Sequence, residues 1–340
     1  MKAFMNLIDE MALARSESQQ IEAFDPYLSF AEMPFRKTYY PLGFPLEVVT
    51  NSKDVLEAAE ESWGCFAKEF ETPPIEFRIG TLPGSSTELP PVSIHRAHRN
   101  LLAKIADHQN FCINDYKQGF TFGWLTEQVV AHRNYFRYHF LDAVALGHIA
   151  NRFSAPVHGA CVELAGSGVL LCGDSGAGKS TLAFACARRG WNYITDDASF
   201  LLTRQSGRRV VGNCHMLRFR PTASELFPEV ADRPITPRVA GKPSIEVRTA
   251  DLPGIRCVTS ANVEHLVFLN RSESIVQEIV PLSKHVARRY LHLRLYGMDE
   301  LRKPQLAAIE RLMAAQVLEM RYHDLDWAVD RLERLAREAS

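Results

Sequence analysis

The sequence predicts an α/β fold in which a glycine-rich motif joins a buried strand to a helix. Gly173 to Ser180 fits the pattern G-x-x-x-x-G-K-[ST], the Walker A motif or P-loop that wraps nucleotide phosphates. The apolar run 169–172 is typical of a buried parallel strand, and the stretch from Lys179 to Gly190 is typical of a helix. A plain strand-to-helix turn with a solvated lysine is the alternative. Motif and context together favour a nucleoside triphosphate site.

Each position of the motif has a chemical reason. Its glycines allow a tight turn in which successive N–H groups point at the phosphates, and the helix N-terminus adds partial positive charge. We expect Lys179 to neutralise the β- and γ-phosphates and the hydroxyl of Ser180 to bind Mg²⁺. The predicted phosphate-binding residues are Gly173, Asp174, Ser175, Gly176, Ala177, Gly178, Lys179, Ser180 and Thr181.

An acidic pair, Asp196 and Asp197, follows the short apolar stretch 192–195. In P-loop proteins the helix leads to a neighbouring parallel strand, and ligands collect at the carboxyl ends of such strands. Adjacent carboxylates on a strand point in different directions. One of them can therefore hold Mg²⁺ while the other accepts a proton from an attacking hydroxyl. The alternative is an Asp-capped turn without chemistry.

His158 lies upstream of the motif. A strand over 159–164, a turn at 166–168 and the strand before the motif form a plausible hairpin, with His158 at one end. Taken by itself, a histidine at a strand edge is more often structural than catalytic.

Together these residues resemble the kinase domain of the HPr kinase/phosphorylase family. The resemblance covers roughly residues 155–203 and is carried by His158-Gly159, the Gly-Asp-Ser-Gly-Ala-Gly-Lys-Ser loop, Arg189-Gly190 and Asp196-Asp197. It implies a fold shared with phosphoenolpyruvate carboxykinases. It also implies that Lys179 and Ser180 serve ATP and Mg²⁺. Within the same resemblance, Asp196 is the base that activates a serine hydroxyl, Asp197 assists the metal, and His158 helps to orient them.

The chain departs from this family downstream, where a Glu-x-Arg-Gly signature is expected. Residues 242–248 read Lys-Pro-Ser-Ile-Glu-Val-Arg and lack the glycine. The chain is therefore more similar to divergent HPr kinase-related proteins, some of which phosphorylate a serine of a ribosomal precursor peptide. We expect an ATP-dependent serine kinase that acts on a protein or peptide, without efficient phosphorylase activity. A small-molecule kinase and a nucleotide-binding regulatory module are the alternatives.

Composition sets the broad class. The 340 residues are 46% hydrophobic with a formal net charge of −1, so no overall basic field favours nucleic acid or an anionic membrane. The 7 cysteines are scattered without a C-x-x-C pair, which argues against disulfides and zinc and for the cytoplasm. Residues 1–15 lack the long apolar core of a signal peptide. Homo-oligomerisation is left open.

The pattern divides the chain into two predicted domains. Residues 1–150 are expected to form a smaller α+β accessory or substrate domain, and 151–340 the P-loop kinase domain. The elements expected in the first are a helix in 1–15, a strand over 45–50, a helix over 54–70, a strand over 75–79, a loop over 80–91, strands within 110–126 and a helix over 134–153.

The second half continues with alternating elements. A hairpin turn at 204–209, an edge strand over 217–220 and a substrate loop over 228–243 with Lys242 as a candidate phosphate contact come first. Residues 285–294 mix basic and apolar positions, a pattern typical of a solvated helix face. The other expected elements are a strand over 265–269, a helix over 306–315, a strand over 317–322, and a helix over 325–337 capped by Asp324.

Overall fold

The structure is a computed structural model, and it describes residues 32–84, 90–204, 207–236, 243–272, 276–293, 295 and 299–338. The predicted helix in 1–15 and the candidate phosphate contact Lys242 lie outside these residues.

The N-terminal part contains a mixed seven-stranded sheet. Strands β2, β3 and β7 run parallel to one another and the other pairings are antiparallel. In spatial order the strands are β1 (Phe35–Tyr39), β2 (Leu46–Thr50), β3 (Ile75–Leu82), β7 (Phe120–Thr126), β6 (Phe111–Asp115), β5 (Leu101–Ile105) and β4 (Ile94–His98). Its helical segments are η2 (Pro41–Gly43), α2 (Lys53–Trp63), α3 (Glu127–Ala131), α4 (Arg133–Phe136), η3 (Arg137–Asp142) and α5 (Ala143–Arg152).

Several predicted elements of this part are confirmed and two boundaries are wrong. The helix expected over 54–70 ends at Trp63, because Gly64 weakens the helix and Phe66 packs into the core from non-helical chain. The loop expected over 80–91 begins too early, since Gly80 to Leu82 still pair with β7. Strands β1, β4 and β5 were not expected. The helix expected over 134–153 is interrupted by η3, a π-helical segment.

A nine-stranded sheet forms the centre of the C-terminal part. Strand β9 lies parallel to β17, and β17 lies parallel to β19, so the predicted parallel strand before the glycine motif is confirmed. The strands are β8 (Ser154–Leu164), β9 (Ser167–Cys172), β10 (Asn192–Thr195), β11 (Ala198–Leu202), β12 (Arg209–Gly212), β16 (Arg256–Cys257), β17 (Ser260–Arg271), β18 (Glu278–Pro281) and β19 (Gln316–Tyr322).

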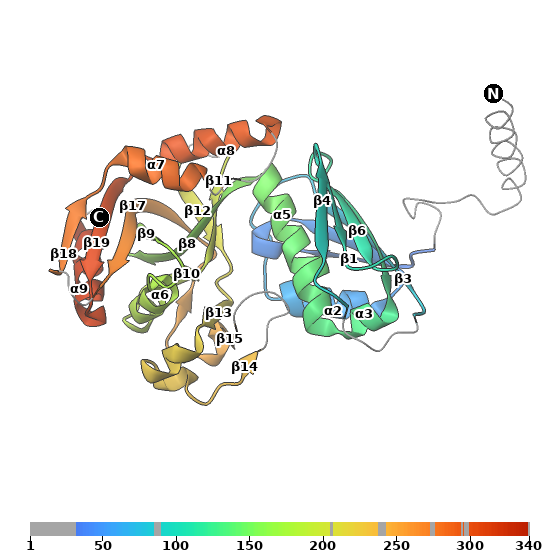
Figure 1. Cartoon of the computed structure of the whole chain (residues 1–340), viewed down its shortest axis with the longest axis horizontal. Helices are drawn as coiled ribbons and strands as arrows, with labels where there is room; N and C mark the ends of the chain where they lie inside the picture. The colour runs from blue at the N-terminus through green and yellow to red at the C-terminus, as the bar shows by residue number, and fades with distance from the viewer. Residues whose placement is uncertain are drawn as a thin grey trace, which may run out of the picture.

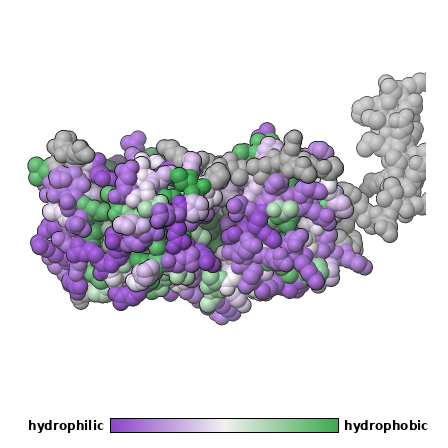
Figure 2. All heavy atoms as spheres, turned by 90° about the horizontal axis from the view of Figure 1, so that it is seen from below, coloured by the Kyte–Doolittle hydropathy of each residue, from purple (hydrophilic) through white to green (hydrophobic). Residues whose placement is uncertain are grey.

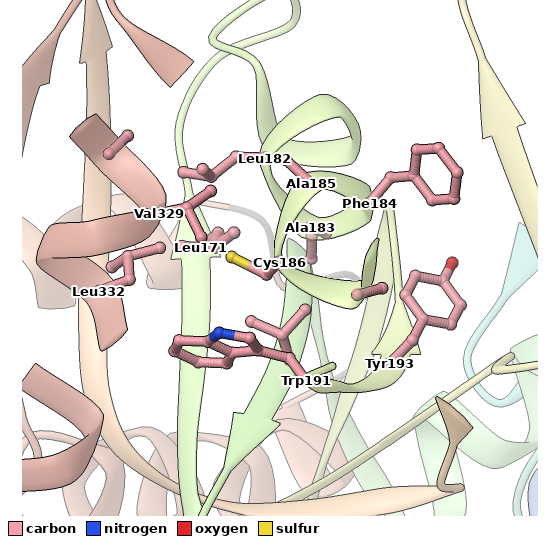
Figure 3. Close-up of a cluster of buried hydrophobic side chains, with 14 of the residues drawn as sticks. Leu171, Leu182, Ala183, Phe184, Ala185, Cys186, Trp191, Tyr193, Val329 and Leu332 are labelled. Atoms are coloured by element: carbon pink, nitrogen blue, oxygen red, sulfur yellow. The ribbon is translucent and has the colours of Figure 1, made fainter. Parts of the chain in front are cut away.

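Helices cover both faces of this sheet (Figure 1). On one face α6 (Lys179–Arg188) and α9 (Leu325–Glu338) pack around a core that includes Leu171, Leu182 and Leu332 (Figure 3). On the other face lie α7 (Lys284–His292) and α8 (Asp299–Leu312). The side chain of Asp324 accepts a hydrogen bond from the Trp327 amide at 2.7 Å, which confirms the predicted cap of α9.

A small three-stranded sheet packs beside α6. It consists of β13 (Met216–Phe219), β15 (Ser244–Arg248) and β14 (Ile235–Thr236), with β15 in the middle. The ring of Phe184 on α6 makes edge contacts with Phe219 and Phe227 at centroid distances of 5.0 and 4.8 Å. The segments η4 (Pro221–Glu225), η5 (Pro228–Val230) and η6 (Thr249–Asp251) connect and flank these strands.

The expected adjacency of two parallel strands around the glycine motif is wrong. Strand β10 does not pair with β9, because β8 lies between them and is antiparallel to both. The tight turn between β8 and β9 makes them hairpin partners, so β8 occupies the edge of β9 that a crossover strand would otherwise take. Since β9 and β10 are both antiparallel to β8, they run in the same direction and end at the same edge of the sheet.

The two sheets share hydrophobic core. Phe200, Leu202 and Val211 of the second sheet belong to the same buried cluster as Val144 and Ile149 of α5. The predicted division at residue 150 into independent domains stays a prediction.

The described surface is mixed in character. Figure 2 shows hydrophilic residues over most of the face seen from below, with smaller hydrophobic patches between them. In the described part of the chain, no helix combines the length and the hydropathy needed to span a bilayer. All seven cysteines lie in described segments and are free thiols.

We predict that Phe184→Ala lowers the free energy of unfolding by about 3–5 kcal/mol, since it empties a fully packed aromatic site. Phe184 is 1% exposed. Urea unfolding measures the effect, and Val276→Ala is the control because Val276 is 78% exposed. Equal losses in the two variants would contradict the packing described for α6 and β13.

Candidate functional site

The predicted site residues meet at one edge of the second sheet, where β8 changes partners. His158 is the last residue of β8 that pairs with β11, opposite Ala198, and Gly159 is the first that pairs with β9, opposite Cys172. Cys172 precedes the glycine loop, which is residues 173–178 between β9 and α6. The change of partner therefore places His158 between the start of this loop and the acidic pair at the end of β10.

The glycine loop is stabilised by its own lysine and by two tyrosines. Lys179 is 6% exposed, and its Nζ donates to the carbonyl oxygens of Gly173 at 2.8 Å and Asp174 at 3.1 Å. The hydroxyl of Tyr290 on α7 donates to Gly173 O at 2.9 Å, and that of Tyr322 on β19 donates to Ala177 O at 3.1 Å. Lys179, Ser180 and Thr181 open α6, so its N-terminus faces the loop.

Asp196 is buried between α6 and β13. Its main-chain oxygen accepts from Ser180 Oγ at 3.2 Å, and its carboxylate Oδ2 accepts from the main-chain N–H of Arg218 at 2.8 Å. Burial raises the pKa of this carboxyl from 3.8 to about 6. A carboxyl group with such a pKa can both accept and release a proton near neutral pH.

Asp197 faces the other way and is exposed. Its Oδ1 lies 3.1 Å from Nδ1 of His158, and this hydrogen bond is the main cause that lowers the pKa of Asp197. The two carboxylates therefore diverge, one buried and one exposed. The two aspartates lie in a bend and not, as the sequence had suggested, on a strand. Their different surroundings, one buried and one exposed, still give the two carboxylates different chemical environments.

Two arginines of the β13 region also approach the site. Nε of Arg218 lies 3.2 Å from Glu246 Oε1 across the β13–β15 pair. The guanidinium of Arg220 reaches Ser175 Oγ in the glycine loop at 3.5 Å. The expected edge strand over 217–220 is confirmed by β13. In the segment that departs from the family signature, Glu246 thus contacts the site through Arg218, whereas Arg248 pairs with Asp251 at 3.1 Å.

Residues of the N-terminal part lie close to β13. The ring of Phe66 contacts the ring of His215, next to β13, at 4.7 Å between centroids. Asp142, at the end of η3, accepts a hydrogen bond from Trp63 Nε1 at 3.0 Å, and burial raises its pKa. The charge of Arg218 acts on this carboxyl in the opposite direction. The N-terminal part therefore contacts the residue before β13, the strand whose Arg218 amide donates to Asp196.

A groove of about 340 Å³ opens beside the glycine loop. Phe268 and Tyr290 form an aromatic wall with ring centroids 5.2 Å apart, and Asn270 donates to Glu319 at 2.8 Å on the polar side. The remaining lining residues are Gly173, Asp174, Leu269 and Leu282.

The oxygen donors at the loop fit a magnesium ion. Mg²⁺ prefers oxygen ligands and in phosphate sites takes one or two protein ligands besides phosphates and waters. Ser180 Oγ, which contacts the Asp196 main chain, and the exposed carboxylate of the next residue, Asp197, are donors of this kind. Within the described segments no cluster of three or more His, Cys, Asp or Glu side chains forms a metal site.

Sequence reasoning missed Tyr290, Tyr322 and Glu246. These residues reach the site only through the pairing of β17 with β19, of β13 with β15, and through the packing of α7. No local motif marks the two tyrosines, so only the fold identifies them, whereas Glu246 lies in the Glu-Val-Arg sequence that stands where the family signature is expected.

Gly178 has the conformation and the contact that make a side chain costly. Both Gly176 and Gly178 have φ of 95°, but a Cβ at Gly178 would clash with the Tyr322 hydroxyl, whereas a Cβ at Gly176 meets nothing within 4 Å. We predict that Gly176→Ala costs about 1–2 kcal/mol of unfolding free energy from backbone strain, and that Gly178→Ala costs more.

The Tyr322→Phe background isolates the contact, because it removes the hydroxyl. There, chemical denaturation should give Gly178→Ala the same cost as Gly176→Ala. A penalty at Gly178 that is unchanged in this background would contradict the described contact.

Comparison with known proteins identifies part of the chain. Residues 149–220 match the model of the HPr serine kinase C-terminal domain. HPr kinase/phosphorylase of Latilactobacillus sakei is 42% identical over 71 residues, 21% of this chain and 22% of that protein. The Lactiplantibacillus plantarum enzyme is 49% identical over 51 residues, 15% of this chain and 16% of that protein.

A solved structure, the Hpr(Ser) kinase/phosphatase of Coxiella burnetii, aligns with 54% of this chain and 98% of that one at 14% identity and a TM-score of 0.29. In the sequence comparisons, by contrast, the chain spans about a fifth of the length of the curated relatives that it matches. The matched segment contains His158, the glycine loop and both aspartates. Over residues 149–220, this chain is therefore HPr kinase-like: it matches the HPr serine kinase C-terminal domain and is similar to HPr kinase/phosphorylases.

Proposed function

We propose that this protein is an ATP-dependent serine kinase that transfers the γ-phosphate to a serine hydroxyl of a protein or peptide. The observation that carries the proposal is Asp196, whose main chain accepts a hydrogen bond from Ser180 in the first turn of α6 and whose buried carboxyl has a pKa raised to about 6. A proton acceptor next to a phosphate-binding helix N-terminus is what phosphoryl transfer from ATP requires.

The glycine loop is proposed to be a P-loop that binds the triphosphate. Its amides and the N-terminus of α6 supply donors and partial positive charge, while Lys179 exchanges the carbonyls of Gly173 and Asp174 for phosphate oxygens. Arg220, 3.5 Å from Ser175 Oγ, adds a second cation. The groove lined by Phe268, Tyr290 and Asn270 is suited to the nucleoside, because it joins an aromatic wall to a polar edge.

Mg²⁺, when bound by Ser180 and Asp197, would neutralise charge that develops on the phosphates. His158 keeps the Asp197 carboxylate oriented and ionised through the 3.1 Å contact. The aspartate is thereby available as an oxygen ligand across the working pH range.

In the transfer step, Asp196 accepts the proton of the serine hydroxyl. The serine oxygen forms a bond to the γ-phosphorus, the bond between that phosphorus and the bridging oxygen of ADP breaks, and ADP leaves with the electron pair. Lys179 holds the phosphates during the step. The protonated Asp196 then returns its proton to solvent, which a pKa near 6 permits.

The acceptor is proposed from the family. The curated relatives are HPr kinase/phosphorylases, and a serine-bearing polypeptide is the corresponding acceptor class. The N-terminal part, through Phe66, contacts His215 directly before the strand that donates to Asp196, which supports an accessory or substrate-presenting role for residues 1–150. A cytoplasmic location and weak phosphorylase activity remain part of the proposal.

We predict that Lys179→Ala abolishes productive ATP binding, because the β- and γ-phosphates lose their principal neutralising charge. Calorimetric titration with a non-hydrolysable ATP analogue and Mg²⁺ measures the affinity. Lys303→Ala removes an exposed lysine of α8 and serves as the control. Wild-type affinity in folded Lys179→Ala would refute the nucleotide site.

The activity is expected to depend on pH through Asp196. The carboxyl must be ionised to accept a proton, so kcat/KM should fall by about tenfold per pH unit below a midpoint near pH 6. Asp196→Asn should keep ATP affinity, lose about two to four orders of magnitude in rate, and show no such limb. A pH profile that is the same in the variant and the wild type would exclude Asp196 as the base.

Asp197→Asn should raise the Mg²⁺ concentration that gives half-maximal activity, because it removes a charge directed at the metal. Rates measured over a Mg²⁺ titration test this, with Asp326→Asn on α9 as a charge-matched control. Superimposable titrations for wild type and Asp197→Asn would show that the two aspartates do not divide their roles in this way.

A further inference from the structure

The basic segment of α7 forms a pocket with α8 on the opposite face of the sheet from α6. The cavity has a volume of about 400 Å³ and is lined by His285, Arg288, Arg289, His292, Leu293 and Arg302. Sequence patterning predicts that these basic residues form a solvated helix face. In the structure they converge on one concavity, since positions 285, 288, 289 and 292 share one side of α7.

The pocket carries positive charge that the described protein does not balance. Arg288 is neutralised by Glu310, to which it donates at 2.7 and 3.0 Å. Arg289 and Arg302 form no ion pair with any carboxylate in the segments that the structure describes. A ligand with negative charge is therefore the complementary partner.

Two buried polar atoms in the pocket also lack a described partner. Nε of Arg302 and Nε2 of His292 have no hydrogen bond within the described part of the molecule. His292 Nε2 lies 4.0 Å from Glu310 Oε1, which is too long for a hydrogen bond. An unpartnered buried polar atom costs free energy, so a side-chain rearrangement that brings either nitrogen to a ligand would be favoured.

Exposed apolar side chains adjoin these charges. Val286 and Leu293 are 51% and 74% exposed, and Arg289 lies between them at the i, i+3, i+7 positions of one helical stripe. A simple inorganic anion would not contact such apolar side chains. A polypeptide with acidic and apolar residues side by side would use both features, since arginine forks bind carboxylates in a two-point geometry.

Helix α7 connects this pocket to the site. Tyr290, the residue after Arg289, donates to Gly173 O at the start of the glycine loop. A chain segment bound along α7 is thus anchored on the element that supports the loop.

From these observations we infer that the α7–α8 pocket is a docking site for an acidic-apolar segment of the polypeptide acceptor. The inference rests on the proposed protein or peptide kinase function and specifies how the acceptor is recognised. Docking outside the reacting centre raises the local concentration of acceptor, so its loss should increase KM and leave kcat nearly unchanged.

Binding of a defined peptide tests the inference. The probe is a fluorescein-labelled peptide in which glutamate alternates with leucine, and its neutral counterpart carries glutamine instead. Fluorescence anisotropy with the full chain should show binding of the glutamate peptide only. Arg289→Glu and Arg302→Glu should each weaken it by about tenfold or more. Lys284→Glu and Lys303→Glu make the same charge change on neighbouring exposed residues outside the pocket lining and should stay within about twofold of wild type.

Each contrary outcome is informative. Equal weakening by the pocket and control variants, or equal binding of both peptides, would overturn the docking site. Inorganic pyrophosphate binding at Arg289 and Arg302 without peptide binding would show a small-anion pocket and also overturn it. If Arg289→Glu does not fold, Arg289→Gln is used in its place, because glutamine keeps most of the side-chain stem. The ATP affinity of the wild type and of Lys179→Ala is measured alongside. If ATP binding depends on Lys179 but the peptide does not bind, the docking site fails while the proposed nucleotide site stands.

Discussion

The site depends on one buried carboxylate and the main-chain groups around it. Asp196 receives a hydrogen bond from the Arg218 amide through its side chain and another from Ser180 through its main chain. These two bonds connect the end of β10, the first turn of α6 and the small sheet that begins at β13. Burial in this position raises the pKa of the carboxyl, and the hydrogen bond from the Arg218 amide opposes this rise without cancelling it.

Packing keeps this arrangement in place. The rings of Phe184, Phe219 and Phe227 join α6 to β13, and β13 holds the amide that meets Asp196. On the other side of the site, the long strand β8 changes partner from β11 to β9 at His158, which brings the histidine to Asp197. The buried and exposed aspartates therefore differ because their supports differ, one a backbone donor in the core and the other an imidazole at the surface.

Local chemistry in the sequence was sufficient to predict the glycine loop and the following helix, because each lies within one short segment. The roles of His158 and of the acidic pair were predicted from the family resemblance. Contacts between distant segments were not predictable in the same way. The tyrosines of α7 and β19 that contact the loop, and Glu246 opposite Arg218, depend on strand register and helix packing. The insertion of β8 between β9 and β10 has the same origin, since a hairpin turn was visible in the sequence but its effect on strand order was not. Helix α2 shows why helix ends are hard to predict from sequence. The apolar residues after Gly64 pack into the core, but they do so outside the helix.

The central claim is that the glycine loop and the acidic pair form one phosphoryl-transfer site. A crystal structure of the full chain with Mg²⁺ and a non-hydrolysable ATP analogue tests it most directly. The account predicts the triphosphate along residues 173–181 with Lys179 on its β- and γ-phosphates, the metal against Ser180 and Asp197, and the Asp196 carboxylate facing the γ-phosphate. Phosphates bound elsewhere on the chain, or a γ-phosphate that Asp196 cannot approach, would contradict it.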